Sequence, residues 1–419
     1  MPSSKDYMEM DDKYCAHNYH PIEVVISKAE GVWVYDPEGK KYLDCLSAYS
    51  SLNTGHGHPE IIKALKEQAD KVTLTSRAFY NDMMGPFLKR LCEVVGTHIN
   101  DPKSTGIMAL PMNTGTEAVS SSLKVARAWG YIKKKIPKNE AIIIVCRGNF
   151  HGRTITIVGF STDIEAVRYY GNFGPYTPGF VTIPYGVAEE LEKTILEIGP
   201  EKVAAFLFEP IQGEAGVRVP PEGFIRKVRD ICTKYNVLMI ADEIQTGFGR
   251  TGELFACDHE NVKPDMILLG KALGGGVYPV SAVVTTRDII GPDVIKPGTH
   301  GSTFGGNPLA SAVALKSLEV HLDDHLAQRA KEFGTYFLEG LKAIAKKKTI
   351  LPIKEVRGKG LLMAIEFDSD ARHIVQMFKA KGVLAKHTHS TSIRFAPPLI
   401  ITKDQIDWAL NIIEEVLVI

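Results

Sequence analysis

Residues 265–279 read DMILLGKALGGGVYP, in which a short apolar run ends at a lysine and a glycine-rich segment. Four apolar residues, from Met266 to Leu269, stand directly before Gly270 and Lys271. Apolar runs of this length without polar alternation are typical of strands that are buried on both faces. A lysine is costly to bury unless it is paired or neutralised, so the placement of Lys271 calls for a chemical explanation.

Similar apolar, β-branched runs recur along the chain and alternate with helical stretches. They are AIIIVC (141–146), VAAFLFEP (203–210), VLMIADE (237–243) and VSAVVTT (280–286). Strands of this kind favour an α/β fold, in which helices cover both faces of a largely parallel sheet. The spacing of apolar residues predicts two of the helices, over 58–72 and 115–135.

The two ends of the chain depart from this pattern. The N-terminal segment has a polar start and predicts a hairpin around residues 36–39. From about residue 310, a long helical pattern leads to strand-like segments and a closing helix. We therefore expect an N-terminal segment (1–45), a large α/β domain with a mostly parallel sheet (46–310) and a smaller C-terminal α+β domain (311–419).

The composition excludes several classes of protein. The 419 residues are 44% hydrophobic and 23% charged, with a net charge of zero and a pI near 7.2. This balance argues against a nucleic acid or a membrane surface held by bulk charge, and no apolar run reaches the roughly 18 residues of a membrane helix. Six scattered cysteines and a start without signal-peptide features favour free thiols in the cytoplasm.

Charged residues stand at the ends of two predicted strands. The run VLMIADE ends in Asp242 and Glu243, and Lys271 follows MILLG. Parallel sheets bind ligands at the carboxyl ends of their strands, so these residues are candidates for a site. One interpretation is a plain buried ion pair. The other is a pyridoxal phosphate site, in which Lys271 bonds covalently to the cofactor aldehyde and Asp242 keeps the pyridine nitrogen protonated.

Two further segments would complete such a cofactor site. In MNTGTEAV (112–119), Gly115 and Thr116 stand before a helical run, where backbone N–H groups and the helix dipole favour a phosphate; an ordinary helix cap is the alternative. In GNFHGRT (148–154), Phe150 either lies on the cofactor ring or closes a hydrophobic core. The guanidinium of Arg153 suits a substrate carboxylate.

Two other patterns are weaker signals. The segment GFGRTG (247–252) matches GxGxxG, but DEIQT separates it from the strand and no clear helix follows, so it does not predict a dinucleotide site. His56 and His58 lack nearby cysteine or carboxylate ligands, which favours a turn over a metal site.

Taken together, the motifs resemble those of the fold-type I, class III aminotransferases, which depend on pyridoxal phosphate. The resemblance covers nearly the whole chain. Its further motifs are EPIQGEAGV (209–217), ADEIQTGFGRTG (241–252), LLGKALGGG (268–276), HGSTFGGNPLA (300–310), VRGKGL (356–361) and RFAPPL (394–399). Several such motifs in one order are a specific signal.

The resemblance implies a role for each cofactor-binding residue. Lys271 would be linked to the cofactor, Asp242 would pair with the pyridinium nitrogen and Gln245 would contact the ring hydroxyl. Phe150 would stack on the ring. The phosphate would be held by Gly115 and Thr116, and by Ser302 and Thr303 of the partner subunit in a homodimer.

Within the family, AHNYHP (16–21) and LSAYSSLNTGHGHP (46–59) resemble the branch that acts on ornithine. This resemblance implies transfer of the δ-amino group of L-ornithine to 2-oxoglutarate. The products would be glutamate and glutamate 5-semialdehyde, which cyclises to pyrroline-5-carboxylate. Substrate-binding roles are implied for Tyr19, Tyr49, Arg153, Glu214 and Arg394, the last two as a switchable ion pair.

Two alternatives stay open. His151 in FHG also resembles acetylornithine aminotransferases, so an acetylornithine or other ω-amino acid aminotransferase is the nearest rival. Tyr19 and Tyr49 favour free ornithine, because an acetylated amine needs no polar contact. A protein that binds the cofactor without catalysis is the second rival, and the presence of Lys271, Asp242 and Arg153 argues against it.

Overall fold

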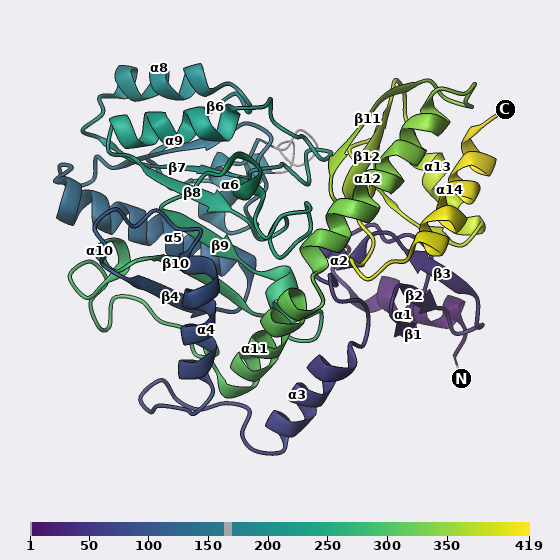
Figure 1. Ribbon diagram of the computed structural model, residues 1–419, viewed down its shortest axis with the longest axis horizontal. Coiled ribbons are helices and arrows are strands. Elements are labelled where there is room, and N and C mark those ends of the chain that lie inside the picture. Colours follow the sequence, from purple (N-terminus) through teal and green to yellow (C-terminus); the bar gives the residue numbers. More distant parts are fainter. Residues whose placement is uncertain (1, 163–169) are drawn as a thin grey trace.

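The computed structural model describes residues 2–162 and 170–419 (Figure 1). A seven-stranded sheet in the order β4-β10-β9-β8-β7-β5-β6 lies at its centre. Its strands are β4 (Ile107–Met112), β5 (Ile142–Cys146), β6 (Phe180–Ile183), β7 (Val203–Phe208), β8 (Leu238–Asp242), β9 (Met266–Leu269) and β10 (Ser281–Thr286). Only β10 runs opposite to the others within this sheet, so the predicted α/β fold with a mostly parallel sheet is confirmed.

The reversed strand β10 follows from the length of its connection. Residues 270–280 join β9 to β10 through a single short 3-10 helix, and a parallel connection needs a longer crossover. Because β4 is antiparallel to β10, it runs in the same direction as β9. The carboxyl ends of β4, β8 and β9 therefore meet at one edge of the sheet.

Helices cover both faces of this sheet (Figure 1). In β9, Met266 and Leu268 pack with α5 on one face, whereas Ile267 and Leu269 pack with α4 and α11 on the other. This two-sided burial explains why the strand has no polar alternation. The covering helices are α4 (Met84–Gly96), α5 (Gly115–Trp129), α6 (Ile155–Phe160), α8 (Ala188–Ile198), α9 (Phe224–Lys234), α10 (Arg287–Ile290) and α11 (Pro308–Asp323).

The C-terminal part forms a separate antiparallel sheet in the order β11-β12-β15-β14. Its strands are β11 (Ile353–Lys359), β12 (Leu362–Phe367), β14 (Lys386–Thr388) and β15 (Ser392–Phe395). Buried residues of α12 (Leu326–Ala345), α13 (Arg372–Ala380) and α14 (Lys403–Leu417) share one hydrophobic core with this sheet. β14 lies at the sheet edge, with Lys386 directly opposite Arg394 of β15.

A third sheet joins the two ends of the chain. It contains β1 (Lys28–Glu30), β2 (Trp33–Tyr35), β3 (Lys41–Asp44) and β13 (Val383–Leu384). The antiparallel pairing of β2 with β3 confirms the predicted hairpin around residues 36–39. β13 pairs in parallel with β3, so a C-terminal strand completes the N-terminal sheet. The domain boundaries near residues 45 and 310 stay a prediction.

The predicted helices are present with small differences at their ends. α3 (Pro59–Ala69) lies within the predicted range 58–72, and α5 continues into a π-helical turn at Gly130–Lys134. The sequence did not predict α1 (Ser4–Tyr14), which a capping box between Ser3 and Asp6 begins and which has no buried residue. No helix in the described ranges is both long and apolar enough to cross a membrane.

Candidate active site

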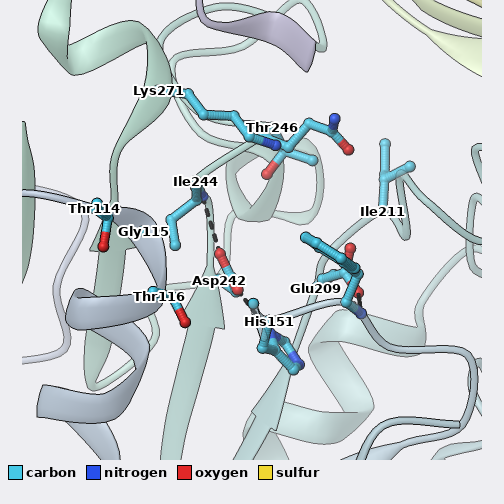
Figure 2. Close-up of a pocket in the computed structure, with 13 residues that line it drawn as sticks. Thr114, Gly115, Thr116, His151, Glu209, Ile211, Asp242, Ile244, Thr246 and Lys271 are labelled. Atoms are coloured by element: carbon cyan, nitrogen blue, oxygen red, sulfur yellow. Dashed lines mark hydrogen bonds and ion pairs between the residues drawn. The ribbon is translucent and has the colours of Figure 1, made fainter. Parts of the chain in front are cut away.

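A cavity of about 240 Å³ opens at the carboxyl ends of the parallel strands (Figure 2). Its lining comes from the segments that follow β4, β5, β7, β8 and β9. The lining residues are Thr114, Gly115, Thr116, Phe150, His151, Gly152, Glu209, Ile211, Asp242, Ile244, Gln245, Thr246 and Lys271. The fold thus brings together six residues that the sequence singled out for a cofactor: Gly115, Thr116, Phe150, Asp242, Gln245 and Lys271.

Lys271 stands where β9 ends, with its side chain extending over the cavity in Figure 2. Its φ is 43°, a left-handed conformation that is strained for a residue with a side chain. Burial lowers the pKa of the Lys271 amine; the charge of Arg394 acts in the same direction, and the carboxylates of Glu214 and Asp242 oppose it. An amine with a lowered pKa is more readily available as a nucleophile and as a proton acceptor.

Asp242 faces the same cavity from the end of β8. Its carboxylate accepts hydrogen bonds from the Ile244 N–H (3.1 Å) and from Nδ1 of His151 (2.6 Å). Within the described residues it makes no ion pair with Lys271, so the interpretation as a plain buried ion pair is wrong. The adjacent Glu243 is absent from the cavity lining and accepts a hydrogen bond from the Cys257 N–H (3.0 Å).

Two further buried ionisable groups lie near Asp242: His151, which is hydrogen-bonded to it, and Glu209, whose pKa its charge raises. Burial lowers the pKa of His151, but the hydrogen bond and the charge of Asp242 outweigh this effect, so the pKa is raised. Burial also raises the pKa of Glu209 to about 7, even though the carboxylate accepts hydrogen bonds from the Phe150 N–H (2.8 Å) and the Gly213 N–H (3.3 Å). The sequence analysis did not single out Glu209, although this residue directly follows β7 and the comparable residue Asp242 ends β8.

The residues around Thr116 fit the phosphate of pyridoxal phosphate. The Thr116 hydroxyl is buried and has no hydrogen-bond partner in the described part of the chain. Gly152 has a φ of 117°, and a Cβ there would come within 2.1 Å of that hydroxyl, so glycine keeps the space beside Thr116 open. Thr114 caps α5 through the Glu117 N–H (3.3 Å), so Gly115 and Thr116 form the first turn of the helix, where the dipole favours an anion.

Aromatic and charged side chains form a connected set beside the cavity, which we call the mouth group: Tyr19, Tyr49, Arg153, Glu214, Lys386 and Arg394. The Arg153 guanidinium lies 5.8 Å from the centroid of the Phe150 ring and 5.9 Å from that of Tyr19. The Lys386 ammonium lies 5.9 Å from the Tyr19 centroid and donates a hydrogen bond to the Tyr49 hydroxyl (2.8 Å). The Arg394 guanidinium lies 5.5 Å from the centroid of the Tyr49 ring.

Glu214 and Arg394 form an ion pair within the mouth group. The Arg394 Nη1 lies 2.7 Å from the Glu214 Oε1, and the side chains are 1% and 25% exposed, respectively. Burial alone would raise the pKa of Glu214, but the charges of Arg394 and Lys271 outweigh it and lower the pKa to about 2. The Glu214 carboxylate is therefore ionised at neutral pH.

Tyr49 is held by an unusual backbone turn. The four residues of α2 (Ser47–Ser50) all have left-handed φ values, between 46° and 68°, and none of them is glycine. Such a conformation costs about 1–2 kcal/mol per residue. The turn is anchored by hydrogen bonds from the Ser47 N–H to Asp44 (2.9 Å) and from the Ser47 hydroxyl to the Ala396 carbonyl (2.7 Å). Strain of this kind is typical of functional sites.

Ser302 and Thr303 are not among the residues that line the cavity within the described chain. The Ser302 hydroxyl accepts hydrogen bonds from the Asn113 amide (3.0 Å) and the Gly305 N–H (2.9 Å), and Thr303 is exposed. Asn113 also lines a second cavity of about 370 Å³, which reaches Lys271 and extends to residues 276–280. The role of Ser302 and Thr303 toward a partner's cofactor stays a prediction.

The two weaker sequence patterns have structural roles. No α-helix follows residues 247–252 before Pro264 in the described chain; instead, the buried Arg250 donates hydrogen bonds to the Leu361 carbonyl (2.9 Å) and the Asn53 amide oxygen (2.7 Å). This segment therefore links the central sheet to the C-terminal part. The expectation that His56 and His58 lack nearby carboxylates is wrong, because Nε2 of His56 lies 2.9 Å from the Asp44 carboxylate and Nε2 of His58 lies 3.7 Å from that of Asp324. His56 itself forms an isolated antiparallel bridge with Gly31.

Comparison with known proteins places the whole chain in one family. The sequence model of the aminotransferases of class III matches residues 14–417. The ornithine aminotransferase of Brevibacillus brevis is 54% identical over 417 residues, which cover 100% of this chain and 99% of that protein.

Solved structures agree with this result. The ornithine aminotransferase from Toxoplasma gondii matches with a TM-score of 0.93 and 45% identity, over 99% of this chain and 95% of that chain. The acetylornithine aminotransferase from Elizabethkingia anophelis matches with a TM-score of 0.87 and 46% identity, over 99% of each chain. Together with the match over residues 14–417, these identities show that the chain belongs to the class-III aminotransferases, a family of pyridoxal-phosphate-dependent enzymes.

Proposed function

We propose that this aminotransferase transfers the δ-amino group of L-ornithine to 2-oxoglutarate, giving glutamate and glutamate 5-semialdehyde, which cyclises to pyrroline-5-carboxylate. The observation that carries the proposal is the Glu214–Arg394 ion pair (2.7 Å) close to the Lys271 amine. Full-length similarity to proteins named ornithine aminotransferase supports it.

Each part of the cavity suits one part of pyridoxal phosphate. Bound cofactor supplies an aldehyde that condenses with amines and an electron-withdrawing ring that stabilises negative charge. Asp242 would hold the ring nitrogen, Gln245 the ring hydroxyl and Phe150 the ring face, while Gly115 and Thr116 would hold the phosphate. The Lys271 amine, with its lowered pKa, would act first as a general base, which takes a proton from the substrate carbon that bears the reacting amine. It would then act as a general acid, which donates that proton to the cofactor.

The mouth group explains how one cavity accepts two substrates in different orientations. Ornithine must present its δ-amine to the cofactor, whereas glutamate must present its α-amine. With ornithine, Arg153 would bind the α-carboxylate and Tyr19 the α-amine, while Glu214 keeps Arg394 neutralised. With glutamate, Arg394 would leave Glu214 and bind the α-carboxylate, and Arg153 would bind the distal one.

A panel of single half-reactions tests the substrate assignment. The pyridoxal form is mixed separately with ornithine, acetylornithine and 4-aminobutyrate, and the loss of the cofactor absorbance near 420 nm is followed. We expect the fastest reaction with ornithine and glutamate 5-semialdehyde as its product. The similarity to an acetylornithine aminotransferase makes acetylornithine the rival. A higher kcat/KM for acetylornithine than for ornithine would show that acetylornithine is the substrate and that the proposal is wrong.

We further propose a cytoplasmic homodimer whose active sites are shared between subunits. Large apolar side chains support an interface near Ser302: Phe79 is 72% exposed, Tyr80 is 97% exposed and Phe304 is 47% exposed. The two segments are linked, because Arg77 donates a hydrogen bond to the Gly305 carbonyl (3.1 Å). Exposed apolar surface of this kind is typical of a protein–protein contact.

Mixed dimers test the shared site. If Thr303 acts in the partner's site, a dimer of one Lys271→Ala subunit and one Thr303→Ala subunit has one site with neither substitution. Random reassortment makes half of the dimers hybrids, so we expect about a quarter of the wild-type activity, well above either parent. Thr303→Ser subunits serve as the control because they keep the hydroxyl. If the mixture is no more active than its parents, Thr303 does not act across the interface.

A further inference from the structure

Lys386 occupies a position that the sheet alone does not explain. It lies on the edge strand β14 directly opposite Arg394, and like charges at directly opposite positions destabilise a sheet. Lysines on edge strands usually project into solvent and hinder aggregation. The Lys386 side chain instead is partly buried and donates a hydrogen bond to the Tyr49 hydroxyl (2.8 Å). A residue that departs in this way from the usual pattern of an edge strand is typical of a functional position.

Lys386 lies in the mouth group, close to Tyr19 and Tyr49. Its ammonium and the Arg153 guanidinium are each 5.9 Å from the centroid of the Tyr19 ring, and Tyr19 is 58% exposed. Neither cation has a carboxylate within 4.0 Å in residues 2–162 and 170–419. Two cations without an ion-pair partner among the described residues thus converge on one exposed aromatic side chain, which makes this part of the mouth group attractive to an anion.

Glu214 leaves the Lys386 ammonium available. The charge of Lys386 contributes to the lowered pKa of Glu214. The Glu214 Oε1, however, is paired with Arg394 at 2.7 Å. An ammonium group has three donors, and the Tyr49 hydroxyl takes one of them. No second hydrogen bond of this ammonium is formed within the described residues, so its other donors can bind an incoming carboxylate.

We propose that Lys386 is a specificity-determining residue that binds a substrate carboxylate together with Arg153. It would contact the carboxylate remote from the reacting amine, namely the α-carboxylate of ornithine and the distal carboxylate of glutamate and 2-oxoglutarate. The assignment rests on the proposed function for the identity of the substrates. Amines without this carboxylate make no such contact with Lys386, so the enzyme discriminates against them.

A comparison of two substrates tests this role. The variant Lys386→Met removes the charge and keeps most of the volume. We expect its kcat/KM for ornithine to fall by about tenfold to a hundredfold, mainly through KM, because a charge-assisted contact is lost. The kcat/KM for 1,4-diaminobutane, which is ornithine without its carboxylate, should stay unchanged. Lys386→Arg should restore most of the loss, since it keeps a positive charge.

The matched control separates carboxylate binding from support of Tyr49. Tyr49→Phe removes the acceptor of the Lys386 hydrogen bond and leaves both cations, so it should affect ornithine and 1,4-diaminobutane by the same factor. If Lys386→Met also affects both amines equally, Lys386 only positions Tyr49 and the proposal is wrong. Lys386→Gln provides a second uncharged variant should the methionine protein fail to fold.

A binding measurement tests Lys386 without turnover. Glutarate has two carboxylates but no amine or keto group, and its Kd for the holoenzyme can be measured by calorimetry. We expect Lys386→Met to raise this Kd about tenfold, with little effect of Tyr49→Phe. An unchanged Kd would overturn the proposal. If the wild-type enzyme does not convert ornithine, the proposed function fails, whereas the glutarate result still decides the role of Lys386.

Discussion

The Lys271→Ala protein is expected to lose more than about a thousandfold of its aminotransferase activity while it still binds pyridoxal phosphate. Among the described residues that line the cavity, Lys271 alone carries an amine. A positioned proton carrier contributes about 10² to 10⁴ in rate, and the same residue would also bond to the cofactor, so both effects are lost together. The cofactor contacts proposed for Thr116, Phe150 and Asp242 would remain, which is why cofactor binding should survive.

Two measurements check this expectation. Activity is followed under single-turnover conditions, and retained cofactor is measured after dialysis. Lys271→Arg is the matched control: it keeps the positive charge, but a guanidinium does not give up its proton in proteins. Both variants should be equally inactive, because the requirement is for an amine rather than for a charge. More than about a thousandth of the wild-type activity in Lys271→Ala would contradict the assigned role.

Replacing Glu214 by alanine should change which amine of ornithine reacts. Arg394 would then have no partner in the pair and would attract the α-carboxylate of ornithine, which brings the α-amine to the cofactor. A charge-assisted contact of about 1.5–3 kcal/mol corresponds to roughly one to two decades in the ratio of α to δ transfer. The glutamate half-reaction should become faster, because Arg394 no longer has to leave a carboxylate.

Product analysis and the rate of the glutamate half-reaction check the role of Glu214. Glu214→Gln is the control that keeps the side-chain volume and an acceptor but removes the charge, so it should resemble Glu214→Ala. Arg394 is 1% exposed, and a buried charge without a partner is destabilising; the Tm of each variant must therefore be measured first. Glutamate 5-semialdehyde as the sole product, with an unchanged glutamate rate, would leave only a structural ion pair.

The low pKa of Glu214 adds a condition to this experiment. The folded protein lowers the pKa from the ordinary value of 4.5 to about 2. The ionised pair therefore contributes stability above pH 4.5, and that contribution is lost as the pH falls toward 2. At neutral pH the carboxylate stays charged, so the selection of the δ-amine in the wild-type enzyme should not change between pH 6 and 8.

Much of the central sheet could be predicted because burial on both faces leaves a strong pattern. The run 237–243 contains β8, and the run 203–210 contains β7, each without polar alternation. β4 was missed because Pro111 stands within it, and proline argues against a strand. The structure accommodates that proline because β4 lies at the sheet edge and pairs only with β10.

Some residues of the candidate site could likewise be predicted from the sequence, and others could not. Asp242 and Lys271 were found because each is a charged residue directly after or within a buried strand end. Lys386 could not be found, because a lysine on a three-residue edge strand is ordinary in sequence and its contact with Tyr49 depends on how distant segments pack. The orientation of β10 was also missed, although the short segment 270–280 rules out a parallel crossover.

The site residues come from different parts of the chain, which affects how activity toward new substrates can evolve. The cavity proposed for the cofactor is built from segments after strands of one sheet, from Thr114 to Lys271. Most of the mouth group comes from other parts of the chain, such as Tyr19 before the first strand and Lys386 near the C-terminus. Substitutions in these peripheral segments can therefore alter the range of amino donors in a lineage, while the catalytic apparatus is inherited unchanged.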